Sequence, residues 1–532
     1  DVTLTITDSV HVDYNGMYVT TPSLEEDLKS GMAKVSAEAT IVNSRKDSEK
    51  ATVTEQILDA DANIVAEKST VQTLSEEKTK VKQELEVKNP HLWSTDDPYL
   101  YTAKTKITVD GTVVDEYETT FGMRYLTFTT DKGFYLNGQY TKLNGMCLHH
   151  DLGALGAATN ERAVERQLQQ MKAMGANAVR TAHNPASKVF IEKCNELGLM
   201  VVEESFDVWT KNKMGNDYSN YFKEHAEEDI KAMVDRDKNA PSVIMWCIGN
   251  EISYQSGDAE VAVNLNNWVK EIDTTRPTTI NQRPKNVNSA TSEKIMDTVD
   301  VVGFSYGSKE LRQEWHKKHP EWVILNLEET SHVESRGVYI YPTEGAFDAT
   351  MTNRTAQMDL ENYQVSAYDL YGRERGPAHS ETILEDLSLD FSLGTFIWTG
   401  VDYIGEPSPY AKESKTLADG TFLMPKSSYY GTVDTAGFEK DSYYLYQSQW
   451  TSTPMVHLLP TNWDQWHDGE EVEVWVNTNQ PSAELFLNGE SLGKKSFDEK
   501  ETAYGKKYYE TSEKTQDDKT WGDSTNPGGY TS

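Results

Sequence analysis

The stretch Val243-Ile244-Met245-Trp246-Cys247-Ile248-Gly249-Asn250-Glu251 is an apolar run that ends in an amide and a carboxylic acid. Strands that are buried on both faces of a parallel sheet read as nearly continuous apolar runs. The residues that follow change to a helical spacing, which places Leu265, Trp268, Val269 and Ile272 on one face. We therefore expect one strand followed by one helix, with polar side chains where the strand ends.

The same alternation of strand and helix recurs through residues 126–451. After the first strand, Asn160 is a candidate N-cap for a helix that Gly175 ends. Eight strand-and-helix units predict a (β/α)8 TIM barrel with insertions. An open doubly wound sheet is the weaker alternative, because no glycine-rich phosphate turn follows the first strand. The other seven predicted strands are Tyr140–Cys147, Ala178–Arg180, Leu199–Val202, Thr278–Ile280, Val299–Phe304, Trp322–Leu327 and Gly394–Trp398.

The segments on either side of this region have a different pattern. Residues 1–125 alternate apolar and polar side chains in short runs, such as Tyr101–Val109, which the turn Asp110-Gly111 follows. Residues 452–532 contain similar runs, but the chain becomes polar after about Phe497, without an obvious final strand. We therefore expect a multidomain chain: a TIM barrel flanked by immunoglobulin-like β-sandwich domains, the second one truncated or loosely ordered.

Composition narrows the possible functions. The chain has 532 residues and a formal net charge of −34, which argues against binding to nucleic acid or to an acidic membrane surface. No stretch of 18 apolar residues occurs, so no membrane-spanning helix is expected. Three scattered cysteines give neither a disulfide framework nor a metal-ligand spacing. No signal peptide is visible, and the sequence leaves open whether the protein is cytoplasmic or secreted.

Polar side chains cluster where the predicted barrel strands end. Catalysis in a TIM barrel belongs at the C-terminal ends of its strands. A single polar residue there is usually a helix cap, but seven of the eight ends carry His, Arg, carboxylate or aromatic residues. These ends are His149-His150-Asp151, Arg180–Pro185, Glu203–Asp207, Asn250-Glu251, Ser305-Tyr306, Glu328-Glu329-Thr330 and Trp398–Asp402.

The residue types at these ends favour carboxylate chemistry. The chain has no His-x-x-x-His, Cys-x-x-Cys or serine-elbow motif, so metallohydrolase and serine-hydrolase readings lack support. Two carboxylates that flank a glycosidic bond can cleave it, and Glu251 and Glu329 are the candidates. Glu328 and Glu329 cannot both face the site if the strand is extended. The alternative is that these acids only form ion pairs with Arg180 and nearby histidines.

Several motifs resemble those of glycoside hydrolase family 2, in particular its bacterial β-galactosidases. The resemblance covers essentially the whole chain. It rests on Gly122-Met123-Arg124 through Asn144-Gly145, His149-His150-Asp151, Arg180–Pro185, Trp246–Glu251, Trp398–Pro407, Ser427–Gly431 and Tyr444–Trp450.

The resemblance implies a retaining mechanism and a role for each motif residue. Glu251 would be the acid/base, and Glu329 the nucleophile, because Glu329-Thr330-Ser331 is similar to the family's Glu-Thr-Ser run. Asn250 would bind the sugar 2-hydroxyl, and Tyr306 would lie beside the nucleophile. The other implied roles are ring-hydroxyl binding by His149, His183 and Asp207, stacking under the sugar by Trp398, and support of the site by Arg180 and Glu204.

Departures from the family pattern affect the substrate prediction. The jelly-roll domain that normally precedes the first sandwich is not present, and Leu327-Glu328 replaces the Gly-Ser that often precedes the nucleophile's Glu-Thr. Arg375 falls where β-galactosidases tend to have a tryptophan, and an arginine there could bind a uronic acid carboxylate. A terminal β-galactoside is therefore the leading substrate. A β-glucuronide or β-galacturonide, and a non-catalytic sugar-binding role, are the alternatives.

No cofactor is expected. The metal ligands of some β-galactosidases do not carry over, because Val208-Trp209-Thr210 occupies the corresponding stretch. The predicted partner is a carbohydrate, with no nucleic acid and no membrane. Assembly into a homo-oligomer is possible, since family members often assemble.

Overall fold

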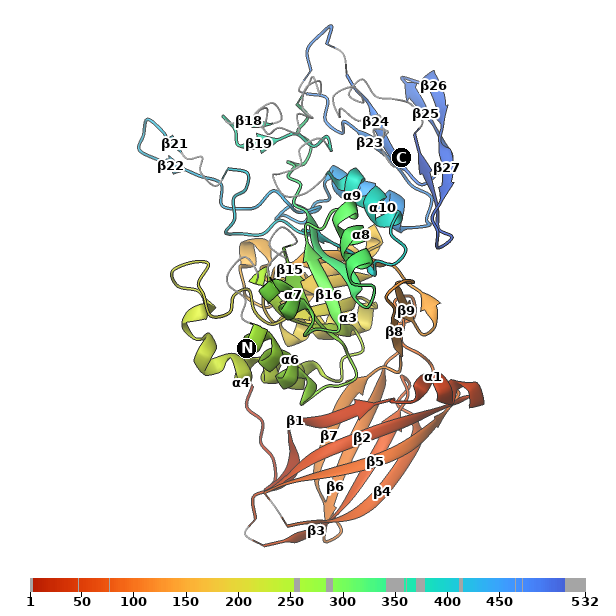
Figure 1. Ribbon diagram of the computed structural model, residues 1–532, viewed down its shortest axis with the longest axis vertical. Coiled ribbons are helices and arrows are strands. Elements are labelled where there is room, and N and C mark those ends of the chain that lie inside the picture. The colour runs from red at the N-terminus through yellow and green to blue at the C-terminus, as the bar shows by residue number, and fades with distance from the viewer. Residues whose placement is uncertain are drawn as a thin grey trace.

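The computed structural model in Figure 1 describes residues 3–45, 47–75, 77–252, 259–283, 290–340, 358–359, 361–369, 378–410, 415–464, 466–470 and 472–511. Three regions follow one another along the chain. An N-terminal β-sandwich lies at the bottom of the view, an eight-stranded barrel in the middle, and a group of small antiparallel sheets at the top. This order of regions confirms the predicted fold class.

The N-terminal sandwich consists of a three-stranded and a four-stranded antiparallel sheet, with strand orders β1-β2-β5 and β4-β3-β6-β7. Alternate residues of both sheets point into one shared core, as in β6, where every second residue is buried. A short helix, α1 (Leu24–Asp27), and a 3₁₀ turn (Leu28–Ser30) join β1 to β2. The strands are β1 (Val10–Thr20), β2 (Met32–Asn43), β3 (Glu49–Leu58), β4 (Ile64–Leu74), β5 (Lys78–Lys88), β6 (Tyr101–Val109) and β7 (Thr112–Phe121).

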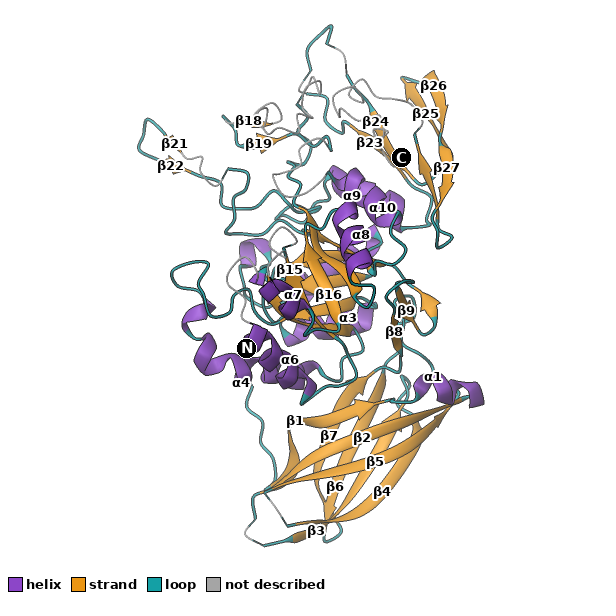
Figure 2. Ribbon diagram, in the orientation of Figure 1, coloured by secondary structure: helices purple, strands orange, loops and turns teal. Residues whose placement is uncertain are grey.

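Eight parallel strands close into the barrel, and all eight coincide with the predicted ones. Inward-facing side chains of the strands form one apolar cluster, and outward-facing ones pack against the surrounding helices. Figure 2 shows these helices around the barrel strands. The interior is tightly filled: a Cβ atom on Gly145 would lie 2.3 Å from the ring of Phe396. The strands are β11 (Leu143–Leu148), β12 (Ala178–Thr181), β13 (Met200–Glu204), β14 (Val243–Asn250), β15 (Thr278–Gln282), β16 (Val301–Ser305), β17 (Val323–Thr330) and β20 (Gly394–Trp398).

The first α-helix after β11, α2, begins and ends at the residues that the sequence predicts. In α2, the side chain of Asn160 accepts a hydrogen bond from the Ala163 N–H at 3.0 Å, and Gly175 ends the helix with a φ of 97°. Both predicted ends of this helix are therefore confirmed. The helices of this region are α2 (Glu161–Met174), α3 (Lys188–Leu197), α4 (Phe222–Asp237), α6 (Ala259–Lys270), α7 (Ala290–Met296), α8 (Lys309–Lys318), α9 (His379–Leu387) and α10 (Asp441–Trp450).

The sandwich docks at the end of the barrel where the strands begin. The Arg124 guanidinium donates to the carbonyl oxygens of Pro241 and Val243, at 2.6 and 2.7 Å, just where β14 starts. Tyr18 donates to Asp273, which precedes β15, at 2.8 Å. Both contacts lie opposite the strand ends that carry the polar motifs. A three-stranded sheet of β8 (Leu126–Phe128), β9 (Phe134–Leu136) and β10 (Gln139–Tyr140) lies between the two regions.

The C-terminal region consists of paired short strands. Two of them, β27 (Asp498–Glu501) and β28 (Lys507–Glu510), lie where the sequence showed no strand. Their signal was hidden because all four residues of β27 are exposed, so no apolar alternation appears. The domain boundaries after residues 125 and 451 stay predictions. The remaining strands are β18 (Met358–Asp359), β19 (Gln364–Val365), β21 (Lys415–Thr416), β22 (Phe422–Leu423), β23 (Val456–Leu459), β24 (Trp475–Thr478), β25 (Ser482–Leu487) and β26 (Glu490–Ser496).

Candidate active site

Polar side chains from four barrel strands meet around the guanidinium of Arg180, in β12. Its Nε and Nη2 donate to the two oxygens of Glu204, both at 2.9 Å. Its Nη1 donates to Glu328 Oε2 at 2.9 Å, and Nη2 also donates to Asn250 Oδ1 at 2.9 Å. One buried cation thus fixes side chains of β13, β14 and β17 relative to its own strand.

The charges in this cluster support one another. Burial opposes the charged form of Arg180, but the carboxylates of Glu204 and Glu328 raise its pKa well above the ordinary value. Burial alone would raise the pKa of Glu204, but Arg180 and His183 outweigh that effect and lower it. Both groups therefore stay charged at neutral pH, as a fully buried ion pair with 0% exposure of either side chain.

Asn250, Asp207 and His183 lie on one side of this cluster. Asn250 Nδ2 donates to Asp207 Oδ1 at 2.8 Å, and His183 Nδ1 lies 2.8 Å from Glu204 Oε1. Asp207 also pairs with Lys213 at 2.7 Å. Burial works against ionisation of Asp207, but the charges of His183 and Lys213 lower its pKa. These groups present an amide, an imidazole and a carboxylate, which are suited to binding hydroxyl groups.

Aromatic rings form another wall of the site. The ring of Trp398, at the end of β20, stacks on His183 with centroids 5.0 Å apart and planes 7° apart. His149 packs against Trp398 at 5.2 Å and against Tyr403 at 4.1 Å. Burial lowers the pKa of His149 well below its usual value, so its ring is neutral at pH 7. Apolar ring faces beside polar groups are typical of sugar-binding sites.

Glu251 follows β14 directly and has a backbone φ of 47°. Residues other than glycine rarely adopt this left-handed conformation, and such conformations cluster at functional sites. The Glu251 carboxyl accepts hydrogen bonds at Oε1 from Ser305 Oγ, at 3.0 Å, and from Arg283 Nε, at 2.5 Å. The guanidinium of Arg283 also lies over the Tyr306 ring, 5.5 Å from its centroid.

Glu328, rather than Glu329, lies beside Tyr306 and Arg283 together with Glu251. Tyr306 donates to Glu328 Oε1 at 2.8 Å, and Arg180 holds the other oxygen. Burial and the negative charges of Glu328 and Glu251 together raise the pKa of Tyr306 well above its usual value. Tyr306 therefore stays protonated, and both carboxylates lie close enough to raise its pKa.

Glu329 lies on the outer face of β17. Asn326 Nδ2 donates to its Oε2 at 2.5 Å, and the Thr330 N–H donates to Oε1 at 3.2 Å. Burial raises the pKa of Glu329 to about 7. Its charged neighbours are Arg312 of α8 and Glu385 of α9. The structure thus does not bring Glu329 together with Glu251.

An irregularity in β17 explains this orientation. Three residue steps from Asn326 to Glu329 pair with two steps from Thr395 to Ile397 of β20. The extra residue interrupts the alternation of side chains, as in a β-bulge. Leu327 packs in the barrel interior, as alternation from Leu325 requires, and because of the extra residue Glu328 also faces inward and reaches Arg180.

Sequence reasoning missed two residues at the end of β15. Asn281 Nδ2 donates to Asn250 Oδ1 at 2.9 Å, and Arg283 binds Glu251. The predicted strand ended at Ile280, so its polar continuation was not recognised. Extending it to Gln282 would have revealed a polar end on β15, the one barrel strand for which none was predicted. Arg375 lies outside the described residues. In the Val208–Thr210 stretch, Val208 and Trp209 are buried apolar side chains.

Comparison with known proteins identifies the family. The model "Glycosyl hydrolases family 2, TIM barrel domain" matches residues 128–344, and "Glycosyl hydrolases family 2" matches residues 10–124. A domain of unknown function matches residues 469–512. The chain belongs to glycoside hydrolase family 2, as its motifs suggested.

The similar proteins include enzymes of two specificities. The β-galactosidase BoGH2A of Bacteroides ovatus is 36% identical over 540 residues, which cover 94% of this chain and 60% of that protein. A β-glucuronidase of Bacteroides fragilis is 27% identical over 517 residues, which cover 94% of this chain and 69% of that protein. The crystal structure of a β-glycosidase from Bacteroides vulgatus matches with a TM-score of 0.77 and 29% identity, over 94% of this chain and 62% of that one.

The chain thus spans about 60% of the length of BoGH2A. Among the described residues, no helix combines the length and the apolar composition needed to cross a membrane.

Proposed function

We propose that the protein is a retaining glycoside hydrolase that removes a terminal β-linked sugar, with Glu251 as acid/base and Glu328 as nucleophile. The observation that carries this proposal is the position of Tyr306. Its hydroxyl donates to Glu328, and the negative charges of Glu328 and Glu251 both raise its pKa. A site that only binds sugar has no need of two carboxyl groups gathered at one point.

The proposed reaction has two displacements. A carboxylate oxygen of Glu328 attacks the anomeric carbon, and Glu251 gives its proton to the glycosidic oxygen, so that the aglycone leaves as an alcohol. Water then attacks the same carbon and passes a proton to Glu251, which releases the sugar and restores the Glu328 carboxylate. Two inversions retain the β-configuration, and we expect the two carboxyl groups to lie roughly 5–5.5 Å apart when sugar is bound.

Glu328 replaces Glu329 in this proposal because of what each side chain contacts. A nucleophile must be ionised and must reach the sugar, and Arg180 and Tyr306 both donate to Glu328. Glu329 contacts Asn326 and lies on the helix side of its strand. Arg283 also contacts the proposed acid: its Nε lies 2.5 Å from Glu251 Oε1, so the Arg283 side chain is placed beside the group that has to reach the glycosidic oxygen.

The surrounding residues receive supporting roles. Arg180 and Glu204 hold the nucleophile and Asn250 in place, and Asn250 binds the sugar 2-hydroxyl. His149, His183 and Asp207 bind ring hydroxyls, and Trp398 packs against the apolar face of the sugar. Each of these side chains lies in the connected network around Arg180 or in the aromatic wall beside it.

A β-galactoside is the proposed substrate, supported by the 36% identity to BoGH2A. A β-glucuronide is the second candidate, supported by the B. fragilis β-glucuronidase, which matches over the same 94% of the chain. In that case Arg375 would bind the uronate carboxylate.

Initial rates on an aryl β-galactoside and the matching aryl β-glucuronide separate these candidates. Turnover of the galactoside alone supports the main proposal, and a preference for the glucuronide favours the second. Absence of turnover with both, in this chain and in any longer form of the protein, would contradict the enzymatic proposal.

A further inference from the structure

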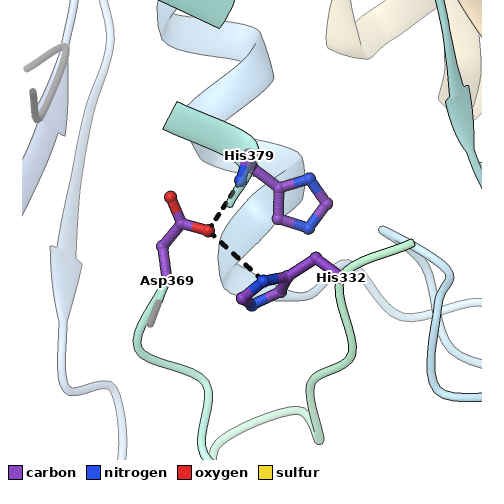
Figure 3. A group of neighbouring side chains, drawn as sticks. All are labelled: His332, Asp369 and His379. Atoms are coloured by element: carbon purple, nitrogen blue, oxygen red, sulfur yellow. Dashed lines mark hydrogen bonds and ion pairs between the residues drawn. The ribbon is translucent and has the colours of Figure 1, made fainter. Parts of the chain in front are cut away.

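Three side chains of types that can hold a metal ion meet in the interior, apart from Glu251 and Glu328. His332, Asp369 and His379 each offer one ligand atom, and these atoms all lie within 4.8 Å of one another (Figure 3). His332 and His379 are both 1% exposed. His332 lies on the segment that leaves β17, four residues after Glu328, and His379 is the first residue of α9.

The imidazole of His332 lacks the hydrogen bonds that a buried ring normally has. Among the described residues, neither of its nitrogens has a hydrogen-bond partner. Its Nδ1 lies 3.7 Å from Asp369 Oδ1, which is too long for a hydrogen bond. Buried polar atoms are nearly always paired, so two unpaired nitrogens on one buried side chain indicate a missing partner.

The other two side chains are held in position. Asp369 accepts the backbone N–H groups of His379 and Ser380, both at 2.9 Å. The ring of His379 is oriented by the Tyr446 hydroxyl, 2.8 Å from its Nδ1. A hydrogen bond from one ring nitrogen to an outer partner is the usual way in which proteins orient a metal-binding histidine, because it leaves the other nitrogen to bind the metal.

We propose that His332, Asp369 and His379 bind a divalent transition-metal ion, with Zn²⁺ as the best match. Two imidazole nitrogens and one carboxylate oxygen are ligands that Zn²⁺ accepts, whereas Ca²⁺ and Mg²⁺ prefer oxygen alone. Ligands at about 2.0–2.2 Å from a tetrahedral ion lie roughly 3.3 Å apart. Binding therefore requires the ligand atoms to approach one another by up to about 1.5 Å.

The charged surroundings of the cluster are compatible with a bound cation. The neighbouring cation, Lys440, is paired with Asp402 at 2.7 Å and also donates to the Glu334 carbonyl.

A metal here would join two elements of the barrel. The last residue of β17 already contacts α9 through the Thr330 and Thr382 hydroxyls, 2.9 Å apart. A bound ion would hold the same junction more firmly. It would therefore also hold the end of β17, which carries Glu328. Its role would be structural, since among the described residues no member of the cluster forms a hydrogen bond with Glu251 or Glu328.

The test is metal uptake by chelator-treated protein, measured by calorimetry with Zn²⁺ and by the visible absorption of bound Co²⁺. We expect one equivalent per chain in the wild type, with a Co²⁺ spectrum of nitrogen and oxygen ligation, and a rise in melting temperature on Zn²⁺ addition. His332→Asn, Asp369→Asn and His379→Gln should each weaken binding by more than about tenfold. His316→Gln is the matched control, because His316 Nδ1 is also unpaired, but among the described residues His316 belongs to no group of three metal-binding side chains.

Failure of the wild type to take up an equivalent of either metal, while its circular dichroism stays native, would overturn the proposal. Uptake that all three variants retain, or that His316→Gln abolishes, would also overturn it by locating the ion elsewhere. If one variant fails to fold, the wild-type titration can still overturn the proposal, and the remaining two variants locate the ion. Because the readouts are binding and melting, the result does not depend on the proposed glycosidase activity.

Discussion

The ends of β13 and β17 both carry two consecutive glutamates, and the two pairs are oriented by different rules. In β13, side chains alternate strictly: Met200 and Val202 face the barrel interior, and Glu204 follows them inward to bind Arg180. In β17, Leu325 and Leu327 face inward, so strict alternation would turn Glu329 inward. The irregular pairing with β20 instead turns Glu328 to Arg180 and leaves Glu329 outside.

The comparison shows that alternation orients a glutamate only where its own strand carries no extra residue. The pairing of β13 with β14 is also irregular, but there the extra residue lies in β14, whereas next to Glu328 it lies in β17 itself. Outside the barrel, the outward-facing member of each pair meets helix residues: Arg236 of α4 lies 3.0 Å from Glu203, and Arg312 of α8 lies near Glu329. Inside the barrel, the guanidinium of Arg180 binds Glu204 of one pair and Glu328 of the other. Substituting the four glutamates one at a time therefore separates the catalytic arrangement from the structural one.

The largest effect is expected for Glu328. Glu328→Gln removes the proposed nucleophile and should lower kcat by at least about 1000-fold, because an amide cannot form the covalent intermediate. Glu329→Gln should retain kcat within about tenfold. Initial rates on the preferred aryl glycoside check both. The reverse ranking, with Glu329→Gln inactive and Glu328→Gln active, would restore Glu329 as the nucleophile.

The next effect is expected for Glu204. Glu204→Gln leaves the buried guanidinium of Arg180 with one carboxylate instead of two, and loss of one member of a buried pair costs roughly 3–5 kcal/mol. Denaturant unfolding should show this loss of stability, and kcat should fall because Arg180 also holds Glu328. A variant as stable as the wild type would show that Arg180 does not depend on Glu204.

A pH-dependent effect is expected for Glu329. Its pKa is raised by burial to about 7, so the folded state disfavours the ionised form. Glu329 should therefore lower stability progressively as the pH rises from about 4.5 to about 7, by a total on the order of 3 kcal/mol. Below about pH 4.5 the Glu329 carboxyl is protonated in the folded and the unfolded state, so it does not lower the free energy of unfolding.

Glu329→Gln removes this contribution. The difference in unfolding free energy between variant and wild type, measured at pH 5 and at pH 7.5, should shift in favour of the variant at the higher pH. The difference cancels the contributions of other buried acids. An equal difference at both pH values would mean that the Glu329 carboxyl titrates normally.

The smallest effect is expected for Glu203. Burial and the charge of Asp237 raise its pKa well above the usual value, so the carboxyl is protonated at pH 7. Glu203→Gln replaces one neutral group by another of the same shape and should change stability by less than about 1 kcal/mol. Denaturant unfolding beside Glu204→Gln is the measurement. A loss as large as that of Glu204→Gln would mean that Glu203 is ionised and paired with Arg236.

Much of the architecture could be predicted because it depends on apolar periodicity. All eight barrel strands and the ends of α2 follow from such patterns and from capping residues. The pairing of Arg180 with Glu204 could also be anticipated, since β13 alternates regularly. The orientation of Glu328 could not, because a bulge depends on how β17 pairs with β16 and β20, strands that are distant in the sequence.

Two further features escaped the sequence for physical reasons. The Asn281 and Arg283 contacts were missed because polar residues at a strand end look like a loop. The strands β27 and β28 were missed because both faces of β27 are exposed and polar. Local patterns identify elements that bury one face, and they give little signal where neither face is buried or where the partner strand sets the register.

The assignment of Glu328 is tested most directly by trapping the covalent intermediate. An aryl 2-deoxy-2-fluoro-β-glycoside of the preferred sugar forms the glycosyl-enzyme bond, and the fluorine slows its hydrolysis because it destabilises the positively charged transition state. Fragmentation of the labelled peptide by mass spectrometry then locates the sugar. We predict that the label is on Glu328. A label on Glu329 would contradict the account.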